Sequence, residues 1–358
     1  MRTAELQSIQ ALRAIAATTV ILVHIPYIGK GAFGVDIFFV ISGFIMCYIS
    51  AENSDDFLLK RVFRIVPLYW LGTMGVFFLA LAAPHLLTGT RASAGHLVKS
   101  LFLIPYIRED GRVYPMLFLG WTLEYEMFFY LIFGVALALF KKWAALASSL
   151  VLLLIVAAGT VFQASATIPR FYSNPLMIEF VLGMGLFWLW KKYRAVLAKL
   201  PAGAAIAIVV AGYVYLFFSK MGYDYRPLVQ GLPALVIVIC SLSLEGAMRF
   251  PIWILAIGDA SYSLYLFHPY VVQLLDKKVH SLAVLTPVSA LMGIIGVLAC
   301  FLVALVSFRL IEKPSNRALR RLLTTKRGQT GRSPLFAPDV GSGGESRAGR
   351  SAEVLPRI

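Results

Sequence analysis

The sequence predicts an all-α protein that crosses a membrane with about ten helices and keeps both termini in the cytoplasm. Three observations support this fold class: a high apolar content, a low charged content and a series of long apolar segments. Of the 358 residues, 59% are hydrophobic and 14% are charged, whereas soluble domains average about 45–50% and about 25%. This composition argues against a soluble enzyme, a disordered protein and a nucleic-acid-binding domain.

The apolar segments are long enough to span a bilayer, which takes about 20 mostly apolar residues. They lie at residues 9–28, 33–51, 65–84, 116–140, 144–163, 174–190, 202–219, 227–244, 253–275 and 283–310. The first and ninth also contain polar residues, which a bilayer tolerates only where they face protein or water. The first holds Arg13 and lacks a small-residue cleavage site after it, so we interpret it as a span rather than a signal peptide.

The basic residues set the expected orientation. With a cytoplasmic N-terminus and ten alternating spans, Lys and Arg are more numerous on the inner side, as the positive-inside rule requires. The C-terminal tail supplies much of that difference. We therefore divide the chain into a membrane domain, residues 1–315, and a basic cytoplasmic tail, residues 316–358, that we expect to be disordered. The apolar run Leu101–Tyr106 is too short to span, so we expect it to lie in the interface or to fold back over a cavity.

The three cysteines are expected to be structural. Cys47, Cys240 and Cys300 each lie inside an apolar run, where cysteine behaves as a small buried hydrophobic residue. Their spacing fits neither a disulfide framework nor a metal site. We therefore expect no bound metal.

Titratable side chains inside the spans are the candidate functional residues, because a charge in a bilayer is costly and usually serves a function. Arg13 and His24 lie eleven residues apart on the first span, which is almost three helical turns and places them on one face. In the predicted topology, four titratable residues from four spans lie at a similar depth in the outer half of the membrane: His24, Asp36, Glu126 and His268. This pattern predicts a polar cavity that opens outwards and is linked inwards by Arg13.

Each of these residues also has a structural interpretation. A membrane histidine can simply bond a neighbouring helix, and His268 can serve the helix end before Pro269. Asp36 or Glu126 can be the structural partner of Arg13 or of a histidine. Their common depth favours a functional role for the group.

A second candidate site lies on the inner side, between the second and third spans. Arg61 and Arg64 form an Arg-x-x-Arg pair, and a spacing of three places both on one helical face. Such a pair can hold a phosphate or diphosphate through charge-assisted hydrogen bonds. The alternative is an ordinary cytoplasmic anchor.

In this order and spacing, the motifs of the chain resemble those of the acyltransferase-3 family of membrane acyltransferases. They are Leu12-Arg13-Ala14 followed by His24, the segment 33–44 (FGVDIFFVISGF), 61–67 (RVFRIVP), Trp121-Thr122-Leu123 with Glu126, 260–268 (ASYSLYLFH) and 311–314 (IEKP). The resemblance covers about residues 5–315. Within the family, the chain is most similar to the exopolysaccharide O-acetyltransferases of the succinoglycan type.

The resemblance implies a ten-span enzyme of the bacterial inner membrane that moves an acyl group, expected to be acetyl, from cytoplasmic acetyl-CoA to a glycan hydroxyl. It implies that His24 is essential, that Arg13 supports it, and that Arg61 and Arg64 contact the acyl donor. The expected partners are acyl-CoA, a glycan or lipid-linked oligosaccharide acceptor, the lipid bilayer and the polysaccharide synthesis machinery. No bound cofactor is expected, since acetyl-CoA acts as a co-substrate. No nucleic-acid partner is expected either.

Two departures from the family pattern limit what carries over. Many members have two adjacent acids after the Trp-Ser-Leu motif, whereas here Glu126 matches the first and Met127 replaces the second. Glu124 occupies a position where a small residue is usual, so no role is transferred to it. The tail is too short and too polar for the hydrolase-like domain of some members, so we expect acceptor choice to reside in the membrane domain.

These observations give a set of candidate roles. The candidate catalytic residues are His24, Asp36 and Glu126, and the candidate substrate-binding residues are Arg13, Arg61, Arg64, Trp121, Tyr262 and His268. A histidine suits the task of activating a sugar hydroxyl near neutral pH. His24 either deprotonates the acceptor or first takes the acyl group, and Asp36 or Glu126 orients its imidazole.

Two other functional classes stay open from the sequence. Buried acids and histidines in about ten spans also suit a secondary transporter or a glycan exporter, although the sequence shows neither an inverted repeat nor paired broken helices. A structural partner of a polysaccharide synthase is the third interpretation. It predicts that every buried charge is dispensable.

Overall fold

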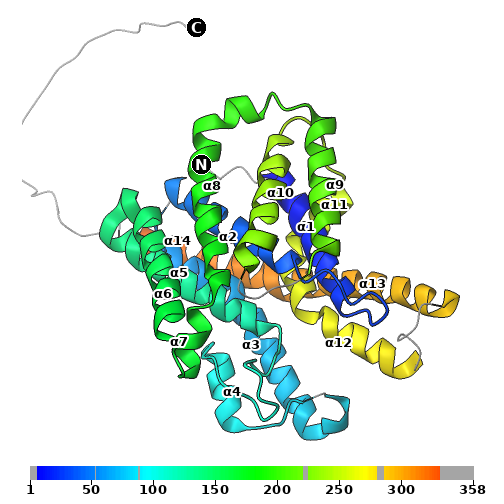
Figure 1. Cartoon of the computed structure of the whole chain (residues 1–358). Coiled ribbons are helices and arrows are strands. Elements are labelled where there is room, and N and C mark those ends of the chain that lie inside the picture. The colour runs from blue at the N-terminus through cyan, green and yellow to red at the C-terminus, as the bar shows by residue number, and fades with distance from the viewer. Residues whose placement is uncertain (1–5, 53, 88, 221–224, 280–285, 331–358) are drawn as a thin grey trace, which may run out of the picture. The chain divides into compact units, whose positions relative to one another are not determined.

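The computed structural model describes residues 6–52, 54–87, 89–220, 225–279 and 286–330, and within these ranges the named elements are all helical (Figure 1). The α-helices are α1 (Gln7–Val23), α2 (Gly34–Glu52), α3 (Phe57–Ala82), α4 (Ala94–Leu101), α5 (Gly120–Phe140), α6 (Ala144–Phe162), α7 (Thr167–Tyr172), α8 (Ile178–Leu197), α9 (Ala202–Phe218), α10 (Leu232–Ser243), α11 (Ile252–Asp259), α12 (Ser261–Val279), α13 (Pro287–Ser307) and α14 (Lys313–Thr330). Each of the ten predicted spans contains one or more of these helices. The all-α fold class is therefore confirmed.

The number of membrane crossings is supported less fully than the helices themselves. By length and composition, four helical stretches among the described residues can cross a membrane: Gly34–Glu52, Phe57–Ala82, Gly120–Phe162 and Pro287–Leu319. Three further apolar helices are shorter: Gln7–Val23, Ala202–Phe218 and Pro227–Ser243. The ten-span topology and the cytoplasmic termini stay predictions.

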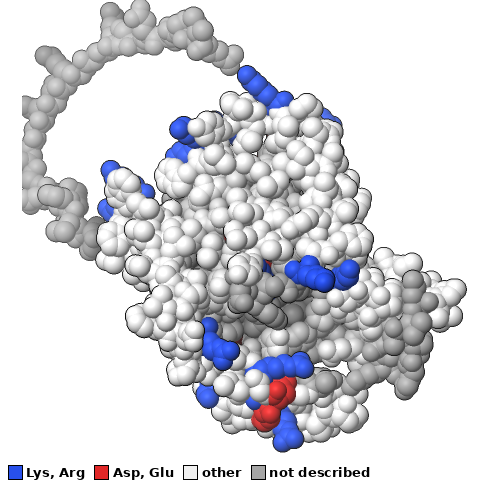
Figure 2. Space-filling model, viewed as in Figure 1, with Lys and Arg blue, Asp and Glu red and all other residues white. Residues whose placement is uncertain are grey.

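The surface agrees with a protein that contacts lipid. Most of the visible face carries no charge, and the charged side chains gather in a few patches, one of them over the region of α4 (Figure 2). Large apolar side chains are well exposed on the predicted spans, for example Phe78, Leu139 and Phe162, which are 58%, 68% and 79% exposed. Such a surface suits a bilayer, because soluble monomers rarely expose large contiguous apolar areas.

The α2 and α8 helices form the tightest crossing in the centre of the fold. A Cβ atom on Gly43 would lie 2.2 Å from the carbonyl oxygen of Phe180, and one on Gly183 would lie 2.1 Å from that of Val40. The two glycines therefore let the backbones touch, as small residues do between membrane helices. Next to this crossing, the ring of Phe180 stacks between Phe39 of α2 and Phe129 of α5, with centroids 4.4 Å apart on both sides.

The predicted ninth span is broken in the structure. Residues 253–275 were expected to form one helix, but α11 ends at Asp259 and α12 begins at Ser261. The break follows a backbone contact with α1, since a Cβ atom on Gly258 would lie 2.1 Å from the carbonyl oxygen of Gln10. The side chain of Gln10 also donates a hydrogen bond to Asp259. These contacts fix α11 across α1, while α12 and α13 run side by side (Figure 1).

The start of the short apolar run Leu101–Tyr106 is tied to α3 by hydrogen bonds, and its expected place in the interface or over a cavity stays a prediction. Tyr69 of α3 donates to the carbonyl oxygen of Ser100 at 3.0 Å, and the indole of Trp70 donates to that of Leu101 at 2.8 Å. The backbone amide of Met116 donates to the Ser100 hydroxyl at 2.9 Å. Ser100 therefore holds both ends of the segment that precedes α5 against α3.

The C-terminal region begins with a helix, α14, which runs from Lys313 to Thr330. The division at residue 315 and the expected disorder of the tail stay predictions. The chain up to Arg317 forms one compact unit and a second begins at Ala318. The rest of the predicted tail lies outside the described residues. The three cysteines are buried and unpaired, as their apolar surroundings predicted.

Candidate active site

The centre of the candidate site is a pair of histidines from two helices. His24 follows the last residue of α1, and His268 lies in α12 immediately before Pro269. The Nδ1 atom of His24 and the Nε2 atom of His268 are 3.1 Å apart, and the two rings meet edge to face. Two of the four residues predicted to share one depth are therefore in direct contact.

One pair of histidine tautomers fits the hydrogen bonds around the two rings. The Nδ1 atom of His268 lies 3.0 Å from the carbonyl oxygen of Leu264, and a carbonyl only accepts, so this nitrogen carries the hydrogen. Its Nε2 atom then accepts from the Nδ1–H group of His24, which also faces the carbonyl oxygen of Val20 at 3.2 Å. This arrangement leaves the lone pair of His24 on Nε2, where it can take a proton from a substrate.

The two histidines differ in accessibility. His268 is 1% exposed, whereas His24 is half-buried. The ring of Phe118 lies 5.7 Å from that of His24. The ring of Tyr265 lies 6.2 Å from that of His268. The hydroxyl of Tyr265 accepts a hydrogen bond from that of Thr122 at 2.9 Å. His24 is therefore the member of the pair that a substrate can reach, and His268 stands behind it.

Asp36 is not a partner of His24. Its two carboxylate oxygens accept from the Nε and Nη2 atoms of Arg226 at 2.8 and 2.9 Å, and its side chain is fully buried. This bidentate ion pair uses both oxygens, so the expectation that Asp36 orients the imidazole is wrong. Arg226 precedes Pro227 at the start of an apolar segment, and no local pattern marks it as the partner of Asp36.

Glu126 also lies away from the histidine pair. It accepts from the hydroxyl groups of Ser42, at 2.9 Å, and Tyr130. Its charge acts on Arg13 and Arg61 rather than on an imidazole. Glu126 thus belongs to a second group of charged residues that contains arginines. No described contact supports the prediction that it orients His24.

That second group, the arginine cluster, consists of Arg13, Arg61, Arg64, Glu126 and Glu312. Three guanidinium groups face two carboxylates, so the cluster carries an excess positive charge. Arg61 is 8% exposed, and its Nε and Nη1 atoms have no hydrogen-bond partner among the described residues. Buried polar groups are almost always paired, so unpaired donors of this kind suit an anionic ligand.

Two members of the cluster need comment. Arg13, which the resemblance assigned to the support of His24, donates from Nη1 to the side chain of Gln10 at 3.1 Å and interacts with the charges of the cluster. Glu312 accepts from the hydroxyl of Ser263 at 2.9 Å. Glu312 was noted in the motif 311–314 without a role, although it is an acid that follows the last apolar segment directly.

The remaining candidates occupy less direct positions. The hydroxyl of Tyr262 donates to the backbone carbonyl of Ile65 at 2.8 Å, so it ties α12 to α3 beside Arg64. Trp121 is half-buried and packs edge to face against Tyr125. Neither side chain contacts the histidine pair through a described hydrogen bond. Among the described residues, no group of three His, Cys, Asp or Glu side chains is placed to hold a metal ion.

Comparison with known proteins supports the identification suggested by the motifs. The acyltransferase domain of the acyltransferase-3 family matches residues 6–307. The chain is 34% identical over 310 residues to the exopolysaccharide production protein ExoZ of Rhizobium meliloti (strain 1021), a match that covers 85% of this chain and 95% of that relative.

A second relative is the peptidoglycan O-acetyltransferase OatA of Listeria monocytogenes, which is 26% identical over 352 residues. That match covers 86% of this chain but 55% of the longer relative. No solved structure matches the chain. Because the family domain spans most of the sequence, the chain belongs to the acyltransferase-3 family of membrane acyltransferases.

Proposed function

We propose that the protein is an O-acyltransferase that moves an acetyl group from cytoplasmic acyl-CoA to a hydroxyl of an exopolysaccharide, another surface glycan or its lipid-linked precursor. The observation that carries this proposal is the histidine pair, which leaves a basic nitrogen on the accessible imidazole of His24. The similarity to ExoZ and OatA, whose names refer to exopolysaccharide production and O-acetylation, supports the acceptor class and the reaction.

The proposed chemistry is general base catalysis. The Nε2 atom of His24 takes the proton of the acceptor hydroxyl while that oxygen attacks the thioester carbonyl carbon. The carbon–sulfur bond then breaks, the new ester forms, and the imidazolium returns its proton to the departing thiolate of CoA. Such base catalysis contributes about 100- to 10,000-fold in rate.

His268 would assist this step without touching the substrate. When His24 becomes an imidazolium, its Nδ1–H group stays bonded to Nε2 of His268 and to the carbonyl of Val20. Two acceptors therefore stabilise the charged ring and keep it in the orientation that directs Nε2 outward. This replaces the carboxylate that the sequence suggested for the task.

The donor would approach from the opposite end of the helix bundle. The unpaired nitrogens of Arg61 and the excess charge of the arginine cluster suit the diphosphate of CoA, because planar guanidinium groups bind phosphate oxygens well. This arrangement requires the cluster to face the cytoplasm, as in the ten-span inner-membrane topology with cytoplasmic termini. Contact with the polysaccharide synthesis machinery belongs to the same proposal.

The test is acetyl transfer by the purified protein in lipid nanodiscs, followed as acetyl-CoA consumption and acetyl-glycan formation. We expect His24→Ala to reduce turnover about 100- to 10,000-fold, while His96→Ala, on the separate helix α4, serves as the matched histidine control. Near wild-type transfer by His24→Ala at equal abundance would contradict the mechanism. Glycan transport without acetyl-CoA consumption would instead favour a transporter.

A further inference from the structure

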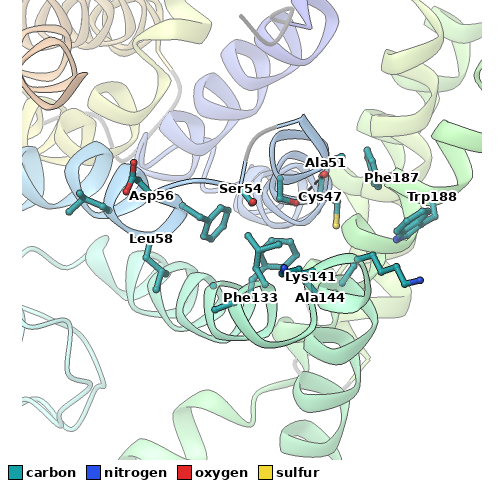
Figure 3. Close-up of a pocket in the computed structure, with 18 of the residues that line it drawn as sticks. Cys47, Ala51, Ser54, Asp56, Leu58, Phe133, Lys141, Ala144, Phe187 and Trp188 are labelled. Carbon is teal, nitrogen blue, oxygen red and sulfur yellow. Dashed lines mark hydrogen bonds between the residues drawn. The ribbon is translucent and has the colours of Figure 1, made fainter. Parts of the chain in front are cut away.

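A pocket of about 840 Å³ lies away from the histidine pair, between the end of α2, the start of α3, the α5–α6 junction and the end of α8 (Figure 3). Neither the family match nor the motifs assign it a role. Its walls combine large apolar rings with several basic side chains. Cys47, Phe133, Lys141 and Trp188 lie around the opening that Figure 3 shows.

The basic side chains of the pocket are Lys141, Lys142 and Lys191, whereas Asp56 is its single acidic residue. The ammonium group of Lys191 lies 5.5 Å from the ring centre of Trp188 and 6.0 Å from that of Phe187, and both rings line the pocket. The pocket therefore carries an excess positive charge next to flat aromatic surfaces. Phosphate groups attached to an aromatic base have the complementary chemistry.

The backbone at Lys141 is an independent sign that this junction is specialised. Lys141 has φ 44° and ψ −105° where α5 ends. A residue with a side chain rarely adopts positive φ, and such strain concentrates at functional sites. The conformation turns the chain sharply, so that Lys141 and Lys142 lie on the pocket wall instead of continuing along α5.

The pocket adjoins the arginine cluster along two helices. Phe57 and Leu58 line it from the first turn of α3, and Arg61 follows one turn later. On α5, Glu126 of the cluster and Leu137 of the pocket are eleven residues apart, which corresponds to about 16 Å of helix. The unpaired nitrogens of Arg61 thus belong to a residue about one helical turn from the pocket wall.

We propose that this lysine pocket binds the nucleotide end of the CoA donor, with its 3′-phosphate on Lys141, Lys142 and Lys191 and its adenine against the aromatic walls. This assignment rests on the proposed function. The diphosphate then lies by Arg61 and Arg64, and the pantetheine arm runs towards His24. An anionic phospholipid headgroup shares the phosphate chemistry, but it needs neither the aromatic walls nor a neighbouring buried guanidinium with unpaired donors.

The experiment compares acetyl-CoA with 3′-dephospho-acetyl-CoA, which lacks the phosphate assigned to the lysines. We expect wild-type protein in zwitterionic nanodiscs to show a KM about tenfold or more lower for acetyl-CoA, the change that loss of one charge-assisted contact produces. Lys142→Ala/Lys191→Ala should remove this preference by raising the KM for acetyl-CoA alone. Lys192→Ala is the matched control, because Lys192 neighbours Lys191 but does not line the pocket. Lys191→Arg should retain part of the preference.

Calorimetric binding of adenosine 3′,5′-bisphosphate provides a second measurement that needs no turnover. If wild-type protein binds this nucleotide and the double variant does not, the pocket assignment stands even if acetyl transfer is absent, and the proposed function alone fails. Equal KM changes for both donors, or no change for either, would overturn the pocket assignment. The same holds if the double variant only loses co-purified anionic phospholipid while its KM values stay at the wild-type level.

Discussion

Among the described residues, the pair of Asp36 and Arg226 and the arginine cluster differ in how completely their charges are satisfied. In the pair of Asp36 and Arg226, two oxygens meet two nitrogens at 2.8 and 2.9 Å. In the arginine cluster, positive charge exceeds negative charge, and two nitrogens of Arg61 have no partner among the described residues. A buried charged group therefore indicates ligand binding only when the protein leaves it without a full set of hydrogen-bond partners or opposite charges. A satisfied pair fastens helices together.

The largest expected effect concerns the satisfied pair. Asp36→Ala should lower the free energy of unfolding by about 3 kcal/mol, because it removes both hydrogen bonds from the buried guanidinium of Arg226 and leaves only the longer-range charge of Glu179 beside it. Membrane abundance and thermal unfolding in detergent measure this loss. Replacing both residues together, as Asp36→Leu/Arg226→Met, should recover much of it. An Asp36→Asn protein with unchanged unfolding but no acetyl transfer would restore the catalytic role that the sequence suggested.

The incomplete group should behave in the opposite way. Arg61→Met should leave thermal unfolding nearly unchanged and raise the KM for acetyl-CoA about tenfold or more, since it removes donors that suit the ligand rather than the protein. Arg61→Lys should restore little, because an ammonium group cannot reproduce the planar fork. Arg194→Met, at an exposed position on α8, is the control. An unaltered donor KM in Arg61→Met would reduce the pair Arg61 and Arg64 to topology signals.

A smaller effect is expected at His268, which contacts the proposed catalytic base His24. His268→Ala removes one acceptor from the Nδ1–H group of His24, so kcat should fall about tenfold, the equivalent of one hydrogen bond of about 1.4 kcal/mol. The KM for the donor should stay constant, and the pH profile of kcat should move to lower pH because the imidazolium loses stabilisation. His268→Gln, whose amide oxygen can accept, should recover part of the rate. An unchanged pH profile would make His268 a packing residue only.

The smallest effect is expected at the edge of the arginine cluster. Tyr130→Phe removes the hydroxyl that donates to Glu126 and leaves the bond from Ser42. We expect a loss of about 1 kcal/mol in the free energy of unfolding, measured by denaturant or thermal unfolding, with little change in turnover. A loss of activity as large as that of Arg61→Met would place Tyr130 within the donor site.

The sequence predicted the helices, but not the direction in which each side chain faces. Glu126 was expected at the depth of His24, yet it interacts with Arg13 and Arg61, which were expected towards the inner side. The expected depth of a residue follows from its position along a span. His24 and His268 were expected at a similar depth, and their side chains are in contact. Asp36 was given the same depth, yet it lies against a different helix, because rotation about a helix axis depends on packing with distant segments. Its partner Arg226 is 190 residues away in the chain, and no local pattern links the two.

The broken ninth span was missed for a related reason. Residues 253–275 have the apolar content of one helix, and no proline lies near Ala260 to mark an end. The interruption arises from a tertiary contact, the approach of Gly258 to the backbone of α1. A glycine in a predicted span was the only local signal, and glycine is common in membrane helices.

The contacts of α2 have a consequence for the size of acyl group that the protein accepts. Asp36 near one end of this helix is paired with Arg226, Gly43 in its middle touches α8, and Cys47 and Ala51 near its other end line the lysine pocket. Because these contacts hold α2 at three points along its length, we expect the helix to keep a fixed position between the two ends of the bundle. If the donor binds as proposed, the distance from the lysine pocket to His24 is fixed, and the additional carbons of a longer acyl chain would extend beyond His24, on the acceptor side.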